Sequence, residues 1–156
     1  MAGVIVLDAS VLIAFLDGDD NHHGAAEQLL TDAVDEDLAV NSLTLAEVLA
    51  SPIRDGRLEP GLAALYALEV RELPFPADTA VRLAQLRAGT NLKMPDCCVI
   101  LAAEGIAAPV ASFDERLTQT AEMRNLPSSP AEPFSAPTES PPQHRLASHT
   151  VVGRHK

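Results

Sequence analysis

The sequence predicts an α/β fold in which a mostly parallel sheet carries helices on both faces. Along the first 126 residues, short apolar runs alternate with longer segments whose apolar residues recur at helical spacing. Apolar residues make up 47% of the 156 residues, which is enough to build a hydrophobic core. A chain of this length suits one domain of ordinary size and is too short for two.

The first half of the chain is expected to form a strand, two helices, a strand and a helix. Residues 3–7 are rich in Val and Ile, as in a buried strand, and Ser10 is a candidate cap for the helix that follows. Pro52 is expected to interrupt the last of these helices, because proline lacks the N–H that a helix interior needs. The five elements are expected at residues 3–7, 11–16, 23–34, 38–40 and 43–50.

The second half continues the alternation. Pro95 is expected to be the first residue of its helix, a position that proline favours, which places Asp96 in the first turn. The order is helix, strand, helix, helix, strand and helix, at residues 62–68, 70–73, 76–88, 95–104, 109–112 and 114–123.

The composition changes after Leu126. Half of the twelve prolines lie between Pro127 and Pro142, and neither helical nor strand periodicity is visible from there to the end. We therefore expect a folded domain at residues 1–126 and a Pro-rich flexible tail at residues 127–156.

The charge balance is strongly acidic, with 11 Lys and Arg against 22 Asp and Glu and a net charge of −11. Such a chain is not expected to bind nucleic acid by neutralising many phosphates. Aromatic residues make up only 3%, which argues against a series of stacking platforms for single-stranded nucleic acid. Neither count excludes a nuclease that handles phosphate through bound metal.

Several absences point to a cytoplasmic protein without a membrane partner. No apolar stretch reaches the roughly 18–20 residues that span a membrane, and the N-terminal apolar run ends at Asp8 with no basic segment before it. Cys97 and Cys98 are adjacent and make no disulfide framework. The Walker-type phosphate loop is absent, and no small-molecule cofactor is expected.

Four acidic residues lie where the predicted elements place functional groups. Asp8 follows the first strand, Asp114 follows the last strand, and Glu47 and Asp96 lie near the starts of helices. In open parallel sheets, ligands bind beyond the carboxyl ends of the strands. Because clustered carboxylates repel one another unless cations lie between them, these four predict a site for Mg²⁺ or Mn²⁺ and phosphoryl chemistry.

Each acid also has a purely structural interpretation. Asp8 is able simply to end a strand, and Asp96 to complement a helix dipole. Thr44-x-x-Glu47 and Ser112-x-x-Glu115 both fit the pattern of a helix-capping box.

The four acids lie in distinctive local sequences: VLDASVLI (6–13), SLTLAEVL (42–49), LKMPD (92–96) followed by ILAA (100–103), and VASFD (110–114). With these motifs in this order, residues 3–126 resemble the PIN-domain ribonucleases of the VapC toxin type. In many members of that family Thr precedes the final acid, where this chain has Ser112.

The resemblance implies a three-layer PIN-like fold. It implies that Asp8, Glu47, Asp96 and Asp114 form the catalytic metal site for Mg²⁺, with Mn²⁺ as an alternative. It further implies hydrolysis of structured RNA such as tRNA or rRNA, a homodimer, and neutralisation by a cognate VapB-like antitoxin.

Five other residues are candidates at this site. Ser10 and Ser112 match the small hydroxyl residues that the family has near its first and last acids, and are able to orient a carboxylate, bind phosphate or cap a helix. The basic residues nearest the motifs are able to hold RNA phosphates or simply to lie on solvated helix surfaces. They are Arg87, Lys93 and Arg116.

Two rival functions remain open. The first is a binding protein that keeps the fold without catalysis. The second is a phosphatase with an aspartyl nucleophile, which also places Asp after the first strand but requires a second Asp two residues later, where this chain has Ser10.

Overall fold

The computed structural model describes residues 2–127, so all of the predicted tail except Pro127 lies outside the described residues. Within them, four parallel strands form one sheet in the order β3-β2-β1-β4. The predicted sheet is thereby confirmed. The strands are β1 (Val4–Leu7), β2 (Asp37–Asn41), β3 (Arg71–Leu73) and β4 (Val110–Ala111).

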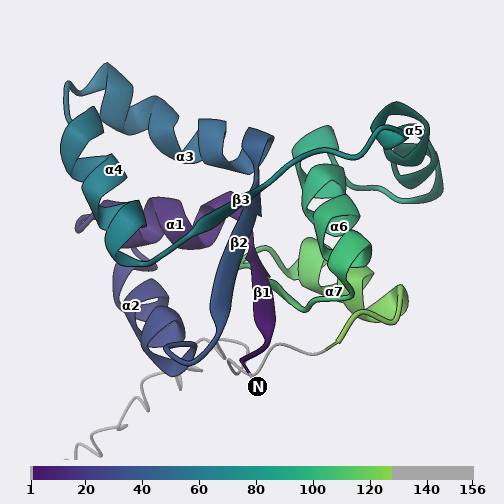
Figure 1. Cartoon of the computed structure of the whole chain (residues 1–156), viewed down its shortest axis with the longest axis horizontal. Coiled ribbons are helices and arrows are strands. Elements are labelled where there is room, and N and C mark those ends of the chain that lie inside the picture. Colours follow the sequence, from purple (N-terminus) through teal and green to yellow (C-terminus); the bar gives the residue numbers. More distant parts are fainter. Residues whose placement is uncertain (1, 128–156) are drawn as a thin grey trace, which may run out of the picture.

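Helices cover both faces of this sheet and complete three layers. Figure 1 shows α1 to α4 on one side of the strands and α5 to α7 on the other. No helix among the described residues is long and apolar enough to cross a membrane. The helices are α1 (Ala9–Leu16), α2 (His23–Asp32), α3 (Ser42–Arg54), α4 (Leu58–Ala67), α5 (Thr79–Gly89), α6 (Met94–Ile106) and α7 (Glu115–Met123).

The central strand β1 contributes side chains to two hydrophobic cores, one on each face of the sheet, because successive side chains of a strand point to opposite faces. Ile5 and Leu7 are fully buried in the core formed with α1, α2, α3 and α4. Val6 is fully buried in the second core, which is built mainly from α6, with Leu86 of α5 and two residues of α7. The continuous apolar run before Asp8 is therefore the signature of a strand covered on both faces.

The structure corrects the prediction that Pro52 interrupts its helix, because α3 continues through Pro52 to Arg54. Pro52 lies in the last turn, and the helix ends two residues after it at Arg54. The backbone carbonyl of Pro52 still accepts from the Arg57 N–H at 2.7 Å, and its ring packs on Gly61 of α4. A side-chain carbon at position 61 would meet this ring at ordinary van der Waals distance, so the packing does not require glycine there.

Several helix starts also differ from the prediction, three of them near a proline. The helix α4 begins at Leu58, and Pro60 is accommodated in its first turn, where its missing N–H costs no hydrogen bond. The helix α5 begins at Thr79, because residues 76–78 form a turn in which the Thr79 N–H bonds to the Pro76 carbonyl. The helix α6 begins at Met94, so Pro95 is its second residue, and Asp96 keeps its predicted place in the first turn.

All four strands end at the same edge of the sheet, because every pairing is parallel. At this edge β1 lies between β2, which follows it in the chain, and β4, the last strand. Such a change in strand order leaves a crevice at the carboxyl ends, where open α/β sheets bind ligands. Leu7 pairs with Ala111 in register, so Asp8 and Ser112 emerge side by side.

Candidate functional site

Asp8 is the centre of a hydrogen-bond network at the carboxyl edge of the sheet. Its side chain is 9% exposed, and its Oδ2 accepts from the hydroxyls of Ser10 at 2.7 Å and Ser112 at 2.8 Å. The two hydroxyl donors on one oxygen hold the carboxylate in one orientation. Among the described residues no donor reaches Oδ1, which leaves that oxygen for a ligand.

The same two hydroxyls tie the loop after β4 to the start of α1. Ser10 Oγ accepts from the Phe113 N–H at 3.1 Å, and Ser112 Oγ accepts from the Asp114 N–H at 2.9 Å. The two serine oxygens lie 3.4 Å apart, but both protons are already committed to Asp8. The predicted helix-capping role of Ser10 is therefore wrong, since Ser10 lies inside α1 and binds Asp8 instead.

Asp114 begins α7 as its N-cap. Its Oδ1 accepts from the Arg116 N–H at 2.9 Å. The predicted capping box of Ser112 and Glu115 is not formed, because Ser112 bonds to the N–H of Asp114 and Asp114 itself caps the helix. One oxygen of Asp114 thus fixes the carboxylate, which is exposed at the edge of the site.

Glu47 lies on α3. The predicted capping box of Thr44 and Glu47 is not formed. The N-cap of α3 is Asn41, whose Oδ1 accepts from the Thr44 N–H at 2.8 Å. Glu47 reaches solvent, yet partial burial of its carboxyl is the largest cause that raises its pKa, followed by the charges of Asp8 and Asp96. Glu47 therefore belongs electrostatically to the carboxylates at this edge.

Asp96 lies close enough to Asp8 and Asp114 for their charges to act on its carboxyl. The pKa of Asp96 is raised first by burial and then by the charges of Asp8 and Asp114, while the N–H and ammonium of Lys93 lower it in part. The four acids come from β1–α1, α3, α6 and β4–α7, so the folded chain brings together four elements that are far apart in sequence. The adjacent thiols of Cys97 and Cys98 are buried, and burial raises the pKa of both.

The chemistry of these donors fits a hard divalent cation. Carboxylate oxygens are the ligands that Mg²⁺ and Mn²⁺ prefer. The pKa values of Glu47 and Asp96 are raised first by burial and then by neighbouring carboxylates, a repulsion that a cation would relieve. Among the described residues, no three His, Cys, Asp or Glu side chains stand close enough to enclose an ion. Mg²⁺ does not require such a cage, because it usually keeps several waters and takes one or two protein carboxylates.

The predicted basic residues lie at different distances from this centre. Lys93 is the residue before α6, near Asp96, and its N–H and ammonium lower the pKa of that carboxyl. Arg116, in the first turn of α7, lines a separate cavity with Arg124. Arg87 lies in the last turn of α5, where its charge acts on the Cys97 thiol.

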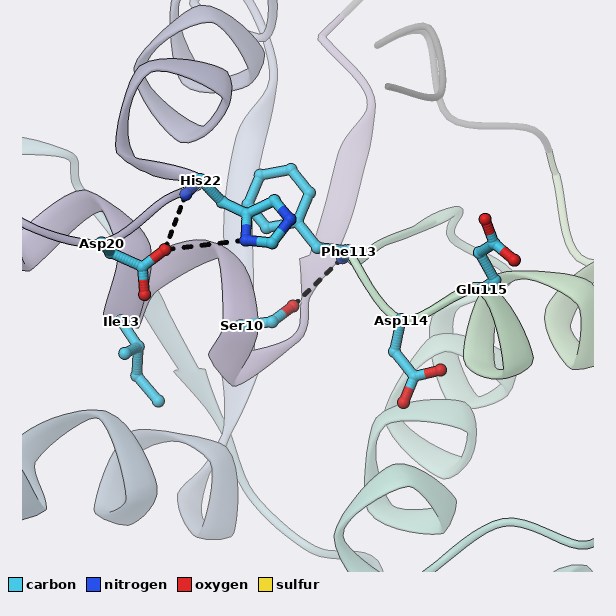
Figure 2. A pocket seen from close by; sticks show the side chains of 7 residues that line it. All are labelled: Ser10, Ile13, Asp20, His22, Phe113, Asp114 and Glu115. Carbon is cyan, nitrogen blue, oxygen red and sulfur yellow. Dashed lines mark hydrogen bonds and ion pairs between the residues drawn. The ribbon is translucent and has the colours of Figure 1, made fainter. Parts of the chain in front are cut away.

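The sequence analysis missed a hollow next to Asp114. Figure 2 shows His22 and Phe113 side by side in this hollow, whose other lining residues are Ser10, Ile13, Asp20, Asp114 and Glu115. His22 comes from the loop before α2 and Phe113 from the loop after β4, so no sequence motif joins them. The one available signal was the position of Phe113 between Ser112 and Asp114.

Comparisons with known proteins agree with this architecture. The family model of the PIN domain matches residues 5–123. Among curated proteins, no sequence match is found.

Solved structures share the fold at low sequence identity. VapC20 of Mycobacterium tuberculosis, described as a toxin that cleaves the sarcin–ricin loop, is 17% identical with a TM-score of 0.61, covering 74% of this chain and 94% of its own. A toxin–antitoxin complex from Klebsiella pneumoniae gives 22% identity and a TM-score of 0.59 over 70% and 86%. VapBC2 of Rickettsia felis, bound to a DNA fragment from its promoter, gives 14% and 0.54 over 80% and 93%.

Proposed function

The chain belongs to the PIN domain family, and from this premise we propose that it is a metal-dependent endoribonuclease that acts as the toxin of a toxin–antitoxin pair. The observation that carries the proposal is the mutual electrostatic influence of Asp8, Glu47, Asp96 and Asp114 at the carboxyl edge of the sheet. A fold alone does not imply an activity, so the argument starts from these side chains. The proposed substrate is structured RNA such as tRNA or rRNA.

The residues divide the work as follows. Asp8 and Asp96 are the main holders of Mg²⁺ or Mn²⁺, with Asp114 completing the site. The ion, when bound, acidifies a water and stabilises charge on the phosphate. Ser10 and Ser112 fix Oδ2 of Asp8, so that the carboxylate keeps one orientation during the reaction.

Glu47 is proposed as the group that positions the attacking water. Its carboxyl reaches solvent from α3, and its raised pKa makes it a better proton acceptor than an ordinary glutamate. It is also able to serve as a metal ligand. Glu47→Gln keeps the size of the side chain and removes its charge, so this variant should lower kcat more than it lowers the affinity for the ion.

The direct test incubates the purified full chain with total RNA, with and without Mg²⁺ or Mn²⁺. Asp8→Ala and Asp96→Ala should abolish cleavage, whereas Asp35→Ala, an exposed acid in the turn before β2, should cleave as well as wild type. Sequencing the new 5′ ends then identifies the RNA. Equal cleavage by wild type and both site variants, or no cleavage under any metal condition, would refute the nuclease and favour a binding protein with this fold.

Lys93 and Arg116 are proposed to hold RNA phosphates on the side of α6 and α7, with Arg87 at the periphery. Because the net charge of −11 repels RNA, these local cations should dominate the salt dependence of binding. Replacing Lys93 by Ala should weaken RNA binding and flatten its dependence on salt. An unchanged salt dependence would remove Lys93 from the interface.

We further propose a VapB-like antitoxin as partner, a homodimer as the functional unit, and the cytoplasm as the location. Two neighbouring structures are described as VapBC and toxin–antitoxin complexes, and the acidic surface suits a basic protein. Expression should arrest growth, and co-expression of the neighbouring upstream reading frame should relieve the arrest. Growth arrest that the upstream frame never relieves would argue against this partner, and the elution volume in size-exclusion chromatography tests the homodimer.

The catalytic unit is proposed to be residues 1–126, with residues 127–156 dispensable for cleavage. All candidate site residues lie within this part, and so does the match to the PIN domain. A chain truncated after Pro127 should cleave RNA at the rate of the full chain. Loss of cleavage by a truncated chain that still unfolds cooperatively would show that the tail takes part.

A further inference from the structure

A pair of stacked rings stands beside the carboxylates and has no role in the mechanism proposed above. The imidazole of His22 and the phenyl ring of Phe113 have centroids 5.0 Å apart and planes inclined by 19°. Figure 2 shows this pair in the hollow that Asp114 and Glu115 border on the other side. The stack is therefore adjacent to the candidate site, although its two members come from distant parts of the chain.

Hydrogen bonds hold both members of the pair. Asp20 Oδ1 accepts from the His22 N–H at 2.7 Å, and the same oxygen lies 3.6 Å from Nδ1 of the imidazole. The Phe113 N–H donates to Ser10 Oγ, which donates in turn to Asp8. The network that holds the central carboxylate thus also holds the backbone at Phe113, while Asp20 holds His22.

The two rings of the pair differ in how far they are buried. Phe113 is partly buried and packs against the core shared by α1 and α3. The His22 side chain is 49% exposed and lines the hollow. A flat ring is able to continue a supported stack of this kind.

The charges around the hollow decide what kind of group it accepts. Asp20, Asp114 and Glu115 all line it, so a phosphate placed there would meet three carboxylates. A nucleobase is uncharged and flat, and stacks on aromatic rings with little dependence on sequence. The hollow therefore suits a base better than a backbone phosphate.

We propose that His22 and Phe113 form a stacking subsite for one unpaired nucleobase of the RNA, next to the phosphate that is cleaved. Phe113 lies between Ser112 and Asp114, so a base stacked on this pair belongs to a nucleotide flanking the carboxylates. The proposal rests on RNA being the substrate. The scarcity of aromatic residues argues against a series of platforms along a strand, and a single subsite is compatible with it.

The test uses the absence of Trp from this chain. His22→Trp in the full chain places the one fluorophore on the proposed subsite, and Tyr66→Trp places it on an 87% exposed position of α4 as a matched control. Each variant is mixed with short oligoribonucleotides of a single base type, or with an abasic ribose–phosphate strand of equal length. Emission is read with Mg²⁺ in the first seconds after mixing.

Quenching of the Trp at position 22 by the base-containing strands, and not by the abasic strand, is the expected result. The Trp at position 66 should respond to neither. No quenching at position 22, or equal quenching by the abasic strand, overturns the proposal. Because this readout is binding, it is separate from the cleavage assay, whose failure alone would refute the nuclease.

Two further variants guard against a folding artefact. With a dye-labelled oligoribonucleotide, His22→Ala should bind about tenfold more weakly than wild type, and His22→Phe should restore most of the affinity because it keeps a flat ring. The thermal melting temperature of each variant should stay close to that of wild type. Binding by His22→Ala equal to that of wild type would show that the ring contributes nothing.

Discussion

The two serine hydroxyls on Asp8 make a prediction that can be worked out in free energy. Both donate to the same oxygen, at 2.7 and 2.8 Å, and that oxygen belongs to a side chain only 9% exposed. A hydrogen bond to a charged group contributes about 1.5–3 kcal/mol. Because Ser10 and Ser112 are themselves only partly buried, the lower end of this range applies. Ser10→Ala and Ser112→Ala should each reduce the free energy of unfolding by about 1.5 kcal/mol.

The double variant should lose more than the sum of the two single variants. Either single variant leaves Asp8 Oδ2 with one hydroxyl donor, whereas the double variant leaves a buried carboxylate oxygen with none. Coupling energies between residues that share a partner are commonly 0.5–3 kcal/mol, and about 1 kcal/mol is expected here. The lost free energy of unfolding then comes from Asp8, the carboxylate on which the proposed metal site depends.

Urea denaturation with EDTA present measures these differences by linear extrapolation. Ser51→Ala is the matched control, because its hydroxyl makes one long bond of 3.3 Å to exposed Asp55, and its effect should stay within about 0.5 kcal/mol. Ser112→Thr should retain the stability, since threonine keeps the hydroxyl. If Ser112→Ala matches the Ser51 control, or if the two losses simply add, the shared-oxygen reasoning is refuted.

Three further predictions concern charge, metal and the cap of α3. With EDTA, Asp96→Asn should melt higher than wild type, because the raised pKa of Asp96 means that the folded state disfavours its ionised form. The raised folded pKa also means that this contribution to stability falls as pH rises from the unfolded value through the folded one. Wild type should therefore lose more stability than Asp96→Asn between about pH 4 and neutrality, and a lower melting temperature for Asp96→Asn would contradict the repulsion. Saturating Mg²⁺ should raise the melting temperature of wild type and not of Asp8→Ala, and an equal rise in both would place the ion elsewhere. Asn41→Ala should cost about 1 kcal/mol in urea by removing the bond to the Thr44 N–H, and no loss would mean that the cap is unimportant.

The carboxyl edge was predictable because its signals are local in sequence. An acid directly after a buried apolar run has few structural uses, and this signal located Asp8 at the end of β1. The context of Asp96, after a proline at a helix start, placed it in the first turn of α6. Local patterns left the role of the hydroxyls open, however, because a serine near a helix start fits a cap whichever partner it has. Ser10 binds Asp8 and the loop after β4, and the sequence contains no record of that contact.

Contacts between distant segments were not predictable either, because local patterns do not reveal which segments lie together in the fold. The stack of His22 on Phe113 depends on the order of strands in the sheet, which brings the loop after β4 next to the start of α1. The cap of α3 was missed because Thr44 and Glu47 fit a capping box better than Asn41 does in isolation. Asn41 ends a strand and caps a helix at once, and its side chain is only 1% exposed. No periodicity or spacing rule identifies a residue with two such roles.

The acidity of the chain is compatible with an RNA substrate, because the surface charges and the carboxylates of the site act on RNA over different distances. The excess of 11 negative charges acts across the whole surface, where salt at physiological strength screens it beyond about 8 Å. The carboxylates at the edge act at contact distance, where burial weakens screening and a bound cation would turn repulsion into attraction for a phosphate. Lys93 lies at that edge, and the stacked rings offer an uncharged contact beside it. Recognition of RNA by this domain should then depend on the bound ion and a few local groups, which act against the repulsion from its net charge.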